Sequence, residues 1–235
     1  MADSTSVGVL SNIFTSPAVA FAAIKERPNP WVPLLLVSLG TAAVSYLYLS
    51  GVDLAWMLDR QLSQGGNLTD AQRTEAVDQA LKLPAAFYYV IGTVSAPLSY
   101  LIYFALIALY FTGVSFATND GVKYGQWFAV IAWSTVPLIF GLAATFVNLL
   151  VTDARFLPPE QLNPLSFSNL LAIDTEGGSI LERTLLSLSV MALWVVGLLI
   201  VGHKVCSQRS IVRSAIVVLG PIVAIVAFGV IVASL

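Results

Sequence analysis

The sequence is poor in charged residues and holds a single cysteine and a single histidine. Asp, Glu, Lys and Arg make up only 10% of its 235 residues, against about 25% in soluble domains. A lone cysteine, Cys206, excludes an internal disulfide framework and the spacing of a zinc ribbon. A lone histidine, His203, leaves little for acid–base or metal chemistry. The chain therefore lacks both the polar surface of a soluble domain and the residues of most active sites.

Motifs of catalysis are absent as well. The sequence contains no phosphate-binding glycine loop, no nucleophile elbow and no paired-histidine motif. His203-Lys204-x-Cys206 is too sparse for a metal site, and a juxtamembrane Cys206 would be palmitoylated only in a suitable host. We therefore predict a protein that is not an enzyme, with no catalytic residue, no cofactor, no metal and no nucleic-acid partner.

What the chain has in quantity is apolar sequence. Hydrophobic residues make up 57% of it, and its mean hydropathy is +0.85. Several uncharged stretches have the length that crosses a bilayer core as a helix. They predict a single all-α domain, a polytopic membrane protein built as a five-transmembrane-helix bundle with short interfacial amphipathic helices. Spans are expected at about 31–52, 85–113, 125–151, 184–202 and 214–234, and outer loops at 53–83 and 152–183.

Aromatic and proline residues mark the predicted spans. Trp31 stands where residues of an aromatic belt lie, and Pro33 falls in the first turn, where its missing N–H costs little. Pro137 lies inside the third span and is expected to kink it. Ser and Thr in spans bond their own helix or a neighbour more often than a substrate, so we interpret them as structural. Asn148, near the outer end of the third span, is the candidate for a functional contact.

The N-terminal segment is expected to lie at the membrane surface. Residues 1–12 are small and polar and are predicted to be loose. A helix then runs over about 16–27, with Ser16 as its cap and Pro17 at its first position. This helix is too short to span the bilayer, so it is either an interfacial helix or a plain lead-in.

Each outer loop contains a signal for the start of a helix. In the first loop, Thr69-x-x-Gln72 matches a capping box ahead of a short amphipathic helix. In the second, Asn before Pro disfavours α-helix at Asn163, so the chain must turn there. We predict that Asn163 caps the turn of Leu165–Leu171, that Pro164 occupies its first position, and that its leucines dock on the outer ends of the spans.

Lysine and arginine are distributed unequally between the two sides of the predicted bundle. The side opposite the N-terminus spreads five basic residues over long loops and holds ten of the thirteen acids. By the density of basic residues near the spans, the N-terminal side is cytoplasmic. We predict a multi-pass protein of a bacterial cytoplasmic (inner) membrane, with its N-terminus in and its C-terminus out. The basic residues of the N-terminal side are Lys25, Arg27, Lys123, Lys204, Arg209 and Arg213.

Short motifs follow one another along the chain in a recognisable order. They are Ile13-Phe14-Thr15-Ser16-Pro17, Trp31-Val32-Pro33, Tyr124-Gly125-Gln126, Ser134-Thr135-Val136-Pro137, Leu162-Asn163-Pro164-Leu165-Ser166, Leu170-Leu171 and Trp194. In this order, over nearly the whole chain, the sequence resembles the Yip family (Ypt/Rab-interacting membrane proteins) in its bacterial branch. The resemblance implies a five-span fold, in agreement with the independent count of spans.

Eukaryotic members of that family work in traffic between the endoplasmic reticulum and the Golgi, where they bind Rab-type GTPases and related five-span partners. This chain lacks their long hydrophilic N-terminal region and their Asp-Leu-Tyr-Gly-Pro motif. Binding of a Rab-type GTPase is therefore not carried over, and the bacterial branch supplies no activity.

Two classes of function remain. The first is a non-catalytic membrane protein that organises the lipid bilayer or binds partner proteins, a second copy of itself included. The second is a small-solute transporter or channel, as an oligomer or alone. A bundle closed by apolar side chains favours the first class, and a polar cavity through the bundle favours the second. We prefer the first.

Overall fold

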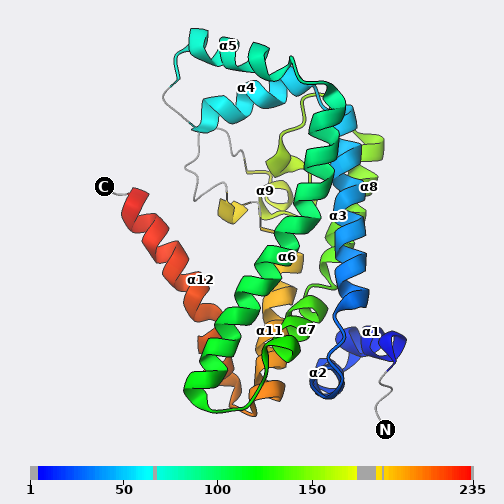
Figure 1. Ribbon diagram of the computed structural model, residues 1–235, viewed down its shortest axis with the longest axis vertical. Coiled ribbons are helices and arrows are strands. Elements are labelled where there is room, and N and C mark those ends of the chain that lie inside the picture. Colours follow the sequence, from blue (N-terminus) through cyan, green and yellow to red (C-terminus); the bar gives the residue numbers. More distant parts are fainter. Residues whose placement is uncertain (1–4, 66–67, 174–183, 187, 234–235) are drawn as a thin grey trace.

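Helices dominate the structure (Figure 1). The computed structural model describes residues 5–65, 68–173, 184–186 and 188–233. The helices are α1 (Ser6–Thr15), α2 (Pro17–Glu26), α3 (Trp31–Gly51), α4 (Leu54–Gly65), α5 (Asp70–Ala80), α6 (Ala85–Thr118), α7 (Tyr124–Ser134), α8 (Leu138–Val151), the 3-10 turn η1 (Pro159–Gln161), α9 (Phe167–Leu170), α11 (Val190–Ser207) and α12 (Ile211–Ala233).

Length and composition identify the helices that could cross a membrane. α3, α6, α11 and α12 each qualify, and α7 with α8 gives a fifth if the two count as one bent span. In Figure 1, α1, α2 and the α6–α7 and α11–α12 turns gather at one end of the bundle, which we call the basal end. α4 and α5 lie at the opposite, distal end. The segments assigned to two sides from the sequence thus lie at opposite ends of one all-α bundle.

Two helices differ in their ends from the predicted spans. The second span was expected to end at 113, but α6 continues to Thr118 and stops where Asn119 adopts a left-handed conformation, with φ of 53°. The fourth was expected over 184–202, but α11 begins at Val190 and runs on to Ser207. The uncharged sequence from 184 onward did not separate the later start from the predicted one, and Ser187 lies outside the described residues.

The third span is broken rather than smoothly kinked. α7 ends at Ser134, α8 starts at Leu138, and the two helices meet at a bend of 42°. Pro137 has no N–H to donate to the Trp133 carbonyl, four residues before it, and the Val136 N–H bonds that carbonyl instead at 3.3 Å. The kink expected from Pro137 is present as a break between two helices.

The N-terminal segment is more ordered than predicted. α1 starts at Ser6, so the prediction of loose residues over 1–12 is wrong for those that the structure describes. The Thr5 hydroxyl accepts a hydrogen bond from the Gly8 N–H at 3.2 Å and caps this helix. The sequence did not predict this helix because small polar residues are mixed with its apolar ones.

α2 packs along the basal end with one face buried. Ser16 is its N-cap residue and Pro17 opens it, as expected, although the Ser16 side chain makes no cap hydrogen bond. Phe21 and Ile24 are buried in the core, whereas Val19 is 42% exposed. A short helix with an apolar face against the bundle and an exposed apolar residue matches an interfacial position.

The first outer loop contains two helices, of which only α5 was predicted. The missed helix, α4, has a cap of its own, since the Asp53 carboxylate accepts from the Trp56 N–H at 3.1 Å. The capping box of Thr69 and Gln72 is present at the start of α5 and confirms that prediction. Only Val77 is buried among the residues of α5, so the amphipathic face expected there is reduced to one buried residue.

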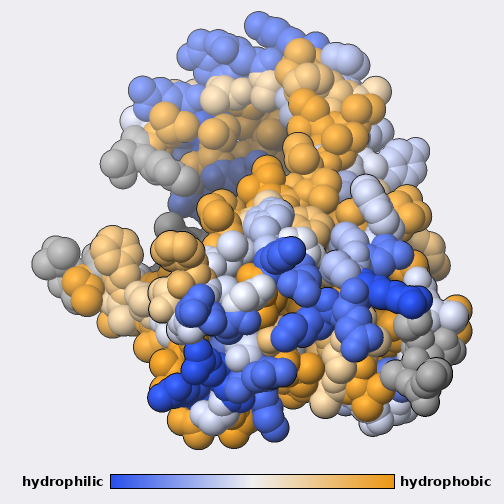
Figure 2. Space-filling view, turned by 60° about the horizontal axis from the view of Figure 1, so that its bottom comes forward, coloured by the Kyte–Doolittle hydropathy of each residue, from blue (hydrophilic) through white to orange (hydrophobic). Residues whose placement is uncertain are grey.

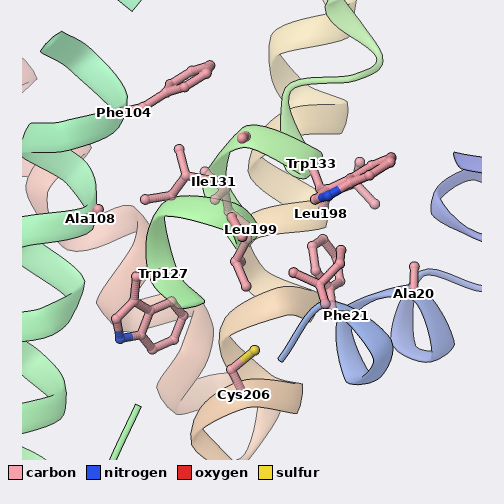
Figure 3. Close-up of a cluster of buried hydrophobic side chains, with 14 of the residues drawn as sticks. Ala20, Phe21, Phe104, Ala108, Trp127, Ile131, Trp133, Leu198, Leu199 and Cys206 are labelled. Carbon is pink, nitrogen blue, oxygen red and sulfur yellow. The ribbon is translucent and has the colours of Figure 1, made fainter. Parts of the chain in front are cut away.

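The main hydrophobic core lies in the basal half of the bundle. Figure 3 shows side chains from α2, α6, α7 and α11 converging there. Phe21, Phe104, Trp127 and Trp133 are each at most 2% exposed. A smaller cluster around Tyr48 packs at the distal ends of α3 and α8. Bulky aromatic side chains thus fill the centre of the basal half.

Gly202 permits the close approach of α11 to α7 and α2. A Cβ at this position would meet Val130 Cγ1 at 2.8 Å and Phe21 Cε1 at 3.2 Å. A Cβ at Gly197, on the same helix, would meet nothing within 4 Å. The two glycines therefore separate the steric role of glycine from its low helix propensity.

We predict that Gly202→Ala lowers the thermal stability of the protein in detergent, whereas Gly197→Ala does not. The first overpacks the core at a cost of about 1–3 kcal/mol. The second improves helix propensity by up to about 1 kcal/mol. Thermal unfolding followed by tryptophan fluorescence measures both, and equal midpoints would contradict the packing of α11 described here.

Candidate functional site

The second outer loop runs down the side of the bundle instead of lying over its end (Figure 1). The Asn148 side-chain amide donates to the Leu162 carbonyl at 3.2 Å. One residue on, the Asn163 side chain lies against α8, where a Cβ on Gly141 would meet its Nδ2 at 3.6 Å. Gly141 lies ten residues before Val151, the last residue of α8. At Asn163 the loop therefore lies about 15 Å along α8 from the distal end of that helix.

We call residues 161–173 the inserted segment. It contains no charged residue. Leu170 is 51% exposed, Leu171 62% and Ile173 42%, so large apolar side chains face outward along an uncharged stretch. Such a surface matches contact with lipid. The predicted docking of Leu170 and Leu171 on the ends of the spans is therefore wrong.

Side-chain amides bond the backbone of the inserted segment. Asn163 Oδ1 accepts from the Leu165 N–H at 3.0 Å and closes a turn. Asn169 Nδ2 donates to the Gln161 carbonyl at 3.0 Å and to the Asn163 carbonyl at 2.8 Å. In hydrocarbon these carbonyls would have no water to bond, so Asn169 supplies each with a partner, beside the Ser166 N–H that also donates to the Asn163 carbonyl at 3.0 Å.

The cap of α9 is Ser166 and not Asn163. The Ser166 hydroxyl accepts from the Asn169 N–H at 3.4 Å, and the helix begins at Phe167. Pro164 therefore precedes the helix instead of occupying its first position. Asn163 and Ser166 are both residue types that helix caps prefer. Asn163 closes a turn instead, so the helix begins three residues later than predicted, at Phe167.

The inserted segment also determines where α11 begins. The Phe167 N–H donates to the Leu188 carbonyl at 2.9 Å, and the Val190 N–H donates to the Leu165 carbonyl at 3.2 Å. These bonds hold the chain extended up to Ser189, and the helix starts immediately after.

A second polar group lies inside the basal core. Nδ1 of His203 lies 2.9 Å from the Ser214 hydroxyl and 3.2 Å from the Ser207 hydroxyl. The imidazole stacks on Trp127, with ring centroids 5.4 Å apart. Its Nε2 is buried and has no hydrogen-bond partner in the described part of the chain. His203, for which the sequence predicted no role, thus connects α7, α11 and the start of α12.

Three aromatic or proline motif positions are structural. Trp31 is 64% exposed at the start of α3, where a belt residue would lie, and Pro33 is buried in the first turn of that helix. Trp194 stacks on Phe140 of α8 and meets Phe14 of α1 edge to face, with centroids 6.5 and 5.5 Å apart. The Trp194 ring therefore ties α11 to α1 and α8.

The remaining candidates for chemistry are occupied or enclosed. The Asn148 amide is bonded on both sides, since its oxygen accepts from the Thr152 hydroxyl at 3.1 Å. Cys206 is completely buried, which leaves its thiol out of reach of a palmitoylating enzyme. Over the described residues, no three His, Cys, Asp or Glu side chains lie close enough to hold a metal ion.

α12 leaves the bundle after its first turns (Figure 1). Ser214 and Val218 are buried, and the Tyr110 hydroxyl donates to the Val217 carbonyl at 2.8 Å, which Pro221 cannot bond. Beyond Pro221 the described side chains are half-buried or exposed. One face of the helix carries a shallow, open apolar hollow, lined by Val212, Ala215, Ile216, Leu219, Gly220 and Val223.

Long apolar helices with exposed hydrophobic faces, between two polar ends, define an integral multi-pass membrane protein. The Yip1 domain profile matches residues 11–233, and the chain therefore belongs to the Yip1 family. It is similar to "Membrane protein YknW" of Bacillus subtilis (strain 168), with 26% identity over 219 residues, 91% of this chain and 86% of that protein. No solved structure gives a significant match. The family predicted from the motifs is confirmed.

Sequence reasoning missed two bonding residues that carried a signal. Ser166 stands three residues before Asn169, the spacing at which a cap hydroxyl accepts a backbone N–H. Pro221 frees the carbonyl of Val217, and a tyrosine in another span was available to bond it. No local signal links His203 to Ser214, because their contact depends on how two helices meet.

We predict that Asn169→Ala destabilises the protein more than Asn163→Ala does. Asn169 bonds two carbonyls, so its loss should cost about 2–4 kcal/mol, whereas Asn163 makes one such bond to an N–H and should cost about 0.5–2 kcal/mol. Thermal midpoints in one detergent compare the two variants. A lower thermal midpoint for Asn163→Ala than for Asn169→Ala would contradict this prediction and make Asn163 the main structural residue of the loop.

Proposed function

We propose that this protein is a non-catalytic member of the Yip1 family that binds a partner membrane protein through α12. The observation that carries the proposal is the poor packing of this helix. Only 11% of its most apolar window is buried inside the protein, against 39% for α11, 28% for α3 and 22% for α6.

The face of α12 suits another helix better than a polar solute. The residues that line its hollow are all apolar, and they include two small residues, Ala215 and Gly220, among branched ones. Small residues let a second helix approach closely, and branched ones pack into its grooves. A transmembrane helix of a partner protein is therefore the occupant that we propose.

Two features support binding over transport. The basal half is filled by the aromatic core around Trp127 and Trp133, both at most 2% exposed. On the distal side, the inserted segment lies against α8 with its amides bonded to its own backbone. Neither arrangement offers a polar route for a solute, and neither supplies the charged groups that ion-coupled transport uses.

The test is photo-crosslinking from four positions of similar exposure in native membranes. Ile216 and Val223 lie in the hollow of α12, at 65% and 63% exposure. Leu39 on α3 and Leu106 on α6 serve as controls at 67% and 61%. We expect one reproducible adduct with an integral membrane protein from the α12 positions and lipid adducts alone from the controls.

A pair of glycines makes the test specific. A Cβ at Gly220 on α12, or at Gly113 on α6, would meet nothing within 4 Å, so both helices accept a larger residue. Gly220→Ile fills the hollow and should abolish the adduct, whereas Gly113→Ile should leave it unchanged. An adduct that survives Gly220→Ile, or that forms equally from Leu39, would refute the proposal.

We further propose that the basal end faces the cytoplasm of a bacterial inner membrane, with the C-terminus outside. The density of basic residues at that end supports this orientation. Reporter fusions after Lys123 and at the carboxyl end should report opposite sides. The same side for both would contradict five crossings.

A further inference from the structure

The two ends of the bundle differ in how their cations are paired. At the distal end the arginines pair with carboxylates of the chain itself. Each of these ion pairs joins segments that are separate in the sequence or adjacent turns of a helix. The pairs are Arg60 with Glu160, Arg73 with Asp59 and Asp70, and Arg155 with Asp53.

At the basal end four cations have no such partner. Lys123, Lys204, Arg209 and Arg213 form no ion pair within 4.0 Å among the residues that the structure describes. The carboxylate of Asp120, in the same region, is already bonded to a hydroxyl and to a backbone N–H of its own turn. We call these four residues the basic cluster.

One hydrogen bond brings the basic cluster together. Nη2 of Arg209, in the α11–α12 turn, donates to the Thr118 carbonyl at 2.8 Å, at the start of the α6–α7 turn. Lys123 is exposed on the α6–α7 turn, and Lys204 and Arg213 are exposed on the helical turns that flank the α11–α12 turn. Figure 2 brings the basal end forward and shows hydrophilic side chains gathered over it, with hydrophobic ones around them.

Large apolar side chains border the basic cluster. Phe116 is 90% exposed next to the α6–α7 turn, and Ile211 and Val212 are 48% and 64% exposed beside Arg213. Lipid must cover such residues in an integral membrane protein, so the cations beside them lie at the level of the lipid headgroups. A soluble acidic protein would leave these side chains in water.

We propose that the basic cluster is a binding surface for the phosphate groups of anionic lipids. The cations lack carboxylates of their own, and headgroup phosphates supply the missing charge at the depth where the cluster lies. The surface holds anionic lipid around the α6–α7 and α11–α12 turns. This surface is separate from the hollow of α12, and its test does not depend on a protein partner.

The experiment uses the full-length protein in nanodiscs of phosphatidylglycerol and phosphatidylcholine in equal amounts. Spin-labelled forms of the two lipids report their relative association with the protein. The variant Lys123→Gln/Lys204→Gln/Arg213→Gln removes three exposed cations and keeps the Arg209 hydrogen bond. We expect its preference for phosphatidylglycerol to fall about fivefold or more, because the loss of a single surface cation already predicts a change of about that size.

Two control variants decide the interpretation. Lys82→Gln/Arg155→Gln removes cations from the distal end and should leave the preference unchanged. Lys123→Arg/Lys204→Arg/Arg213→Lys keeps the charge and should retain the preference. Thermal midpoints establish that each variant is folded. An unchanged preference in the triple glutamine variant, or an equal loss in the distal variant, would overturn the proposal.

Discussion

A backbone N–H or carbonyl inside the bilayer must find its partner within the protein, because no water is there to supply one. Three irregular places in the described part of the chain fit that constraint. The carbonyl that Pro221 leaves unbonded accepts from Tyr110 on another span. At the break before Pro137, the freed Trp133 carbonyl accepts a hydrogen bond from the Val136 N–H instead. In the inserted segment, Asn169 bonds two carbonyls at once. Since such partners come from other turns and other helices, the bonds that satisfy the backbone also fix how the elements sit together.

The same bonds leave the bundle closed and one helix outside it. The inserted segment occupies the side of α8 and delays the start of α11 to Val190. The aromatic core fills the basal half beneath it. α12 is attached at its root, through Ser214 and Val217, and its remaining length has little of the protein against it. The one poorly packed helix is the physical basis on which we propose that the protein binds a partner in the membrane, and the basic cluster would hold anionic lipid next to the root of that helix.

The features that the sequence predicted correctly each depend on a single segment. Uncharged length predicted the apolar helices, Pro137 predicted a bend, and Thr69 with Gln72 predicted a capping box. Features that depend on two segments could not be predicted. The start of α11 is set by pairing with Leu165, and nothing between 184 and 190 reveals it. Burial of His203 reflects the meeting of helices, so its sequence context at a charged turn was misleading. The sequence of α12 is more apolar than that of α3, α6 or α11, but this composition alone does not show that the helix lies apart from them.

The depth of the inserted segment tests this account most directly. A nitroxide on Leu171→Cys, in a Cys206→Ala background, reports its surroundings by electron paramagnetic resonance in liposomes. Collisions with oxygen increase toward the bilayer centre, and collisions with a water-soluble nickel complex decrease. The account predicts that this label behaves like one on Leu39, exposed on α3, and unlike one on Gln72, exposed on α5. A label at position 171 that meets nickel as freely as the one on Gln72 would place the segment in water and contradict the account.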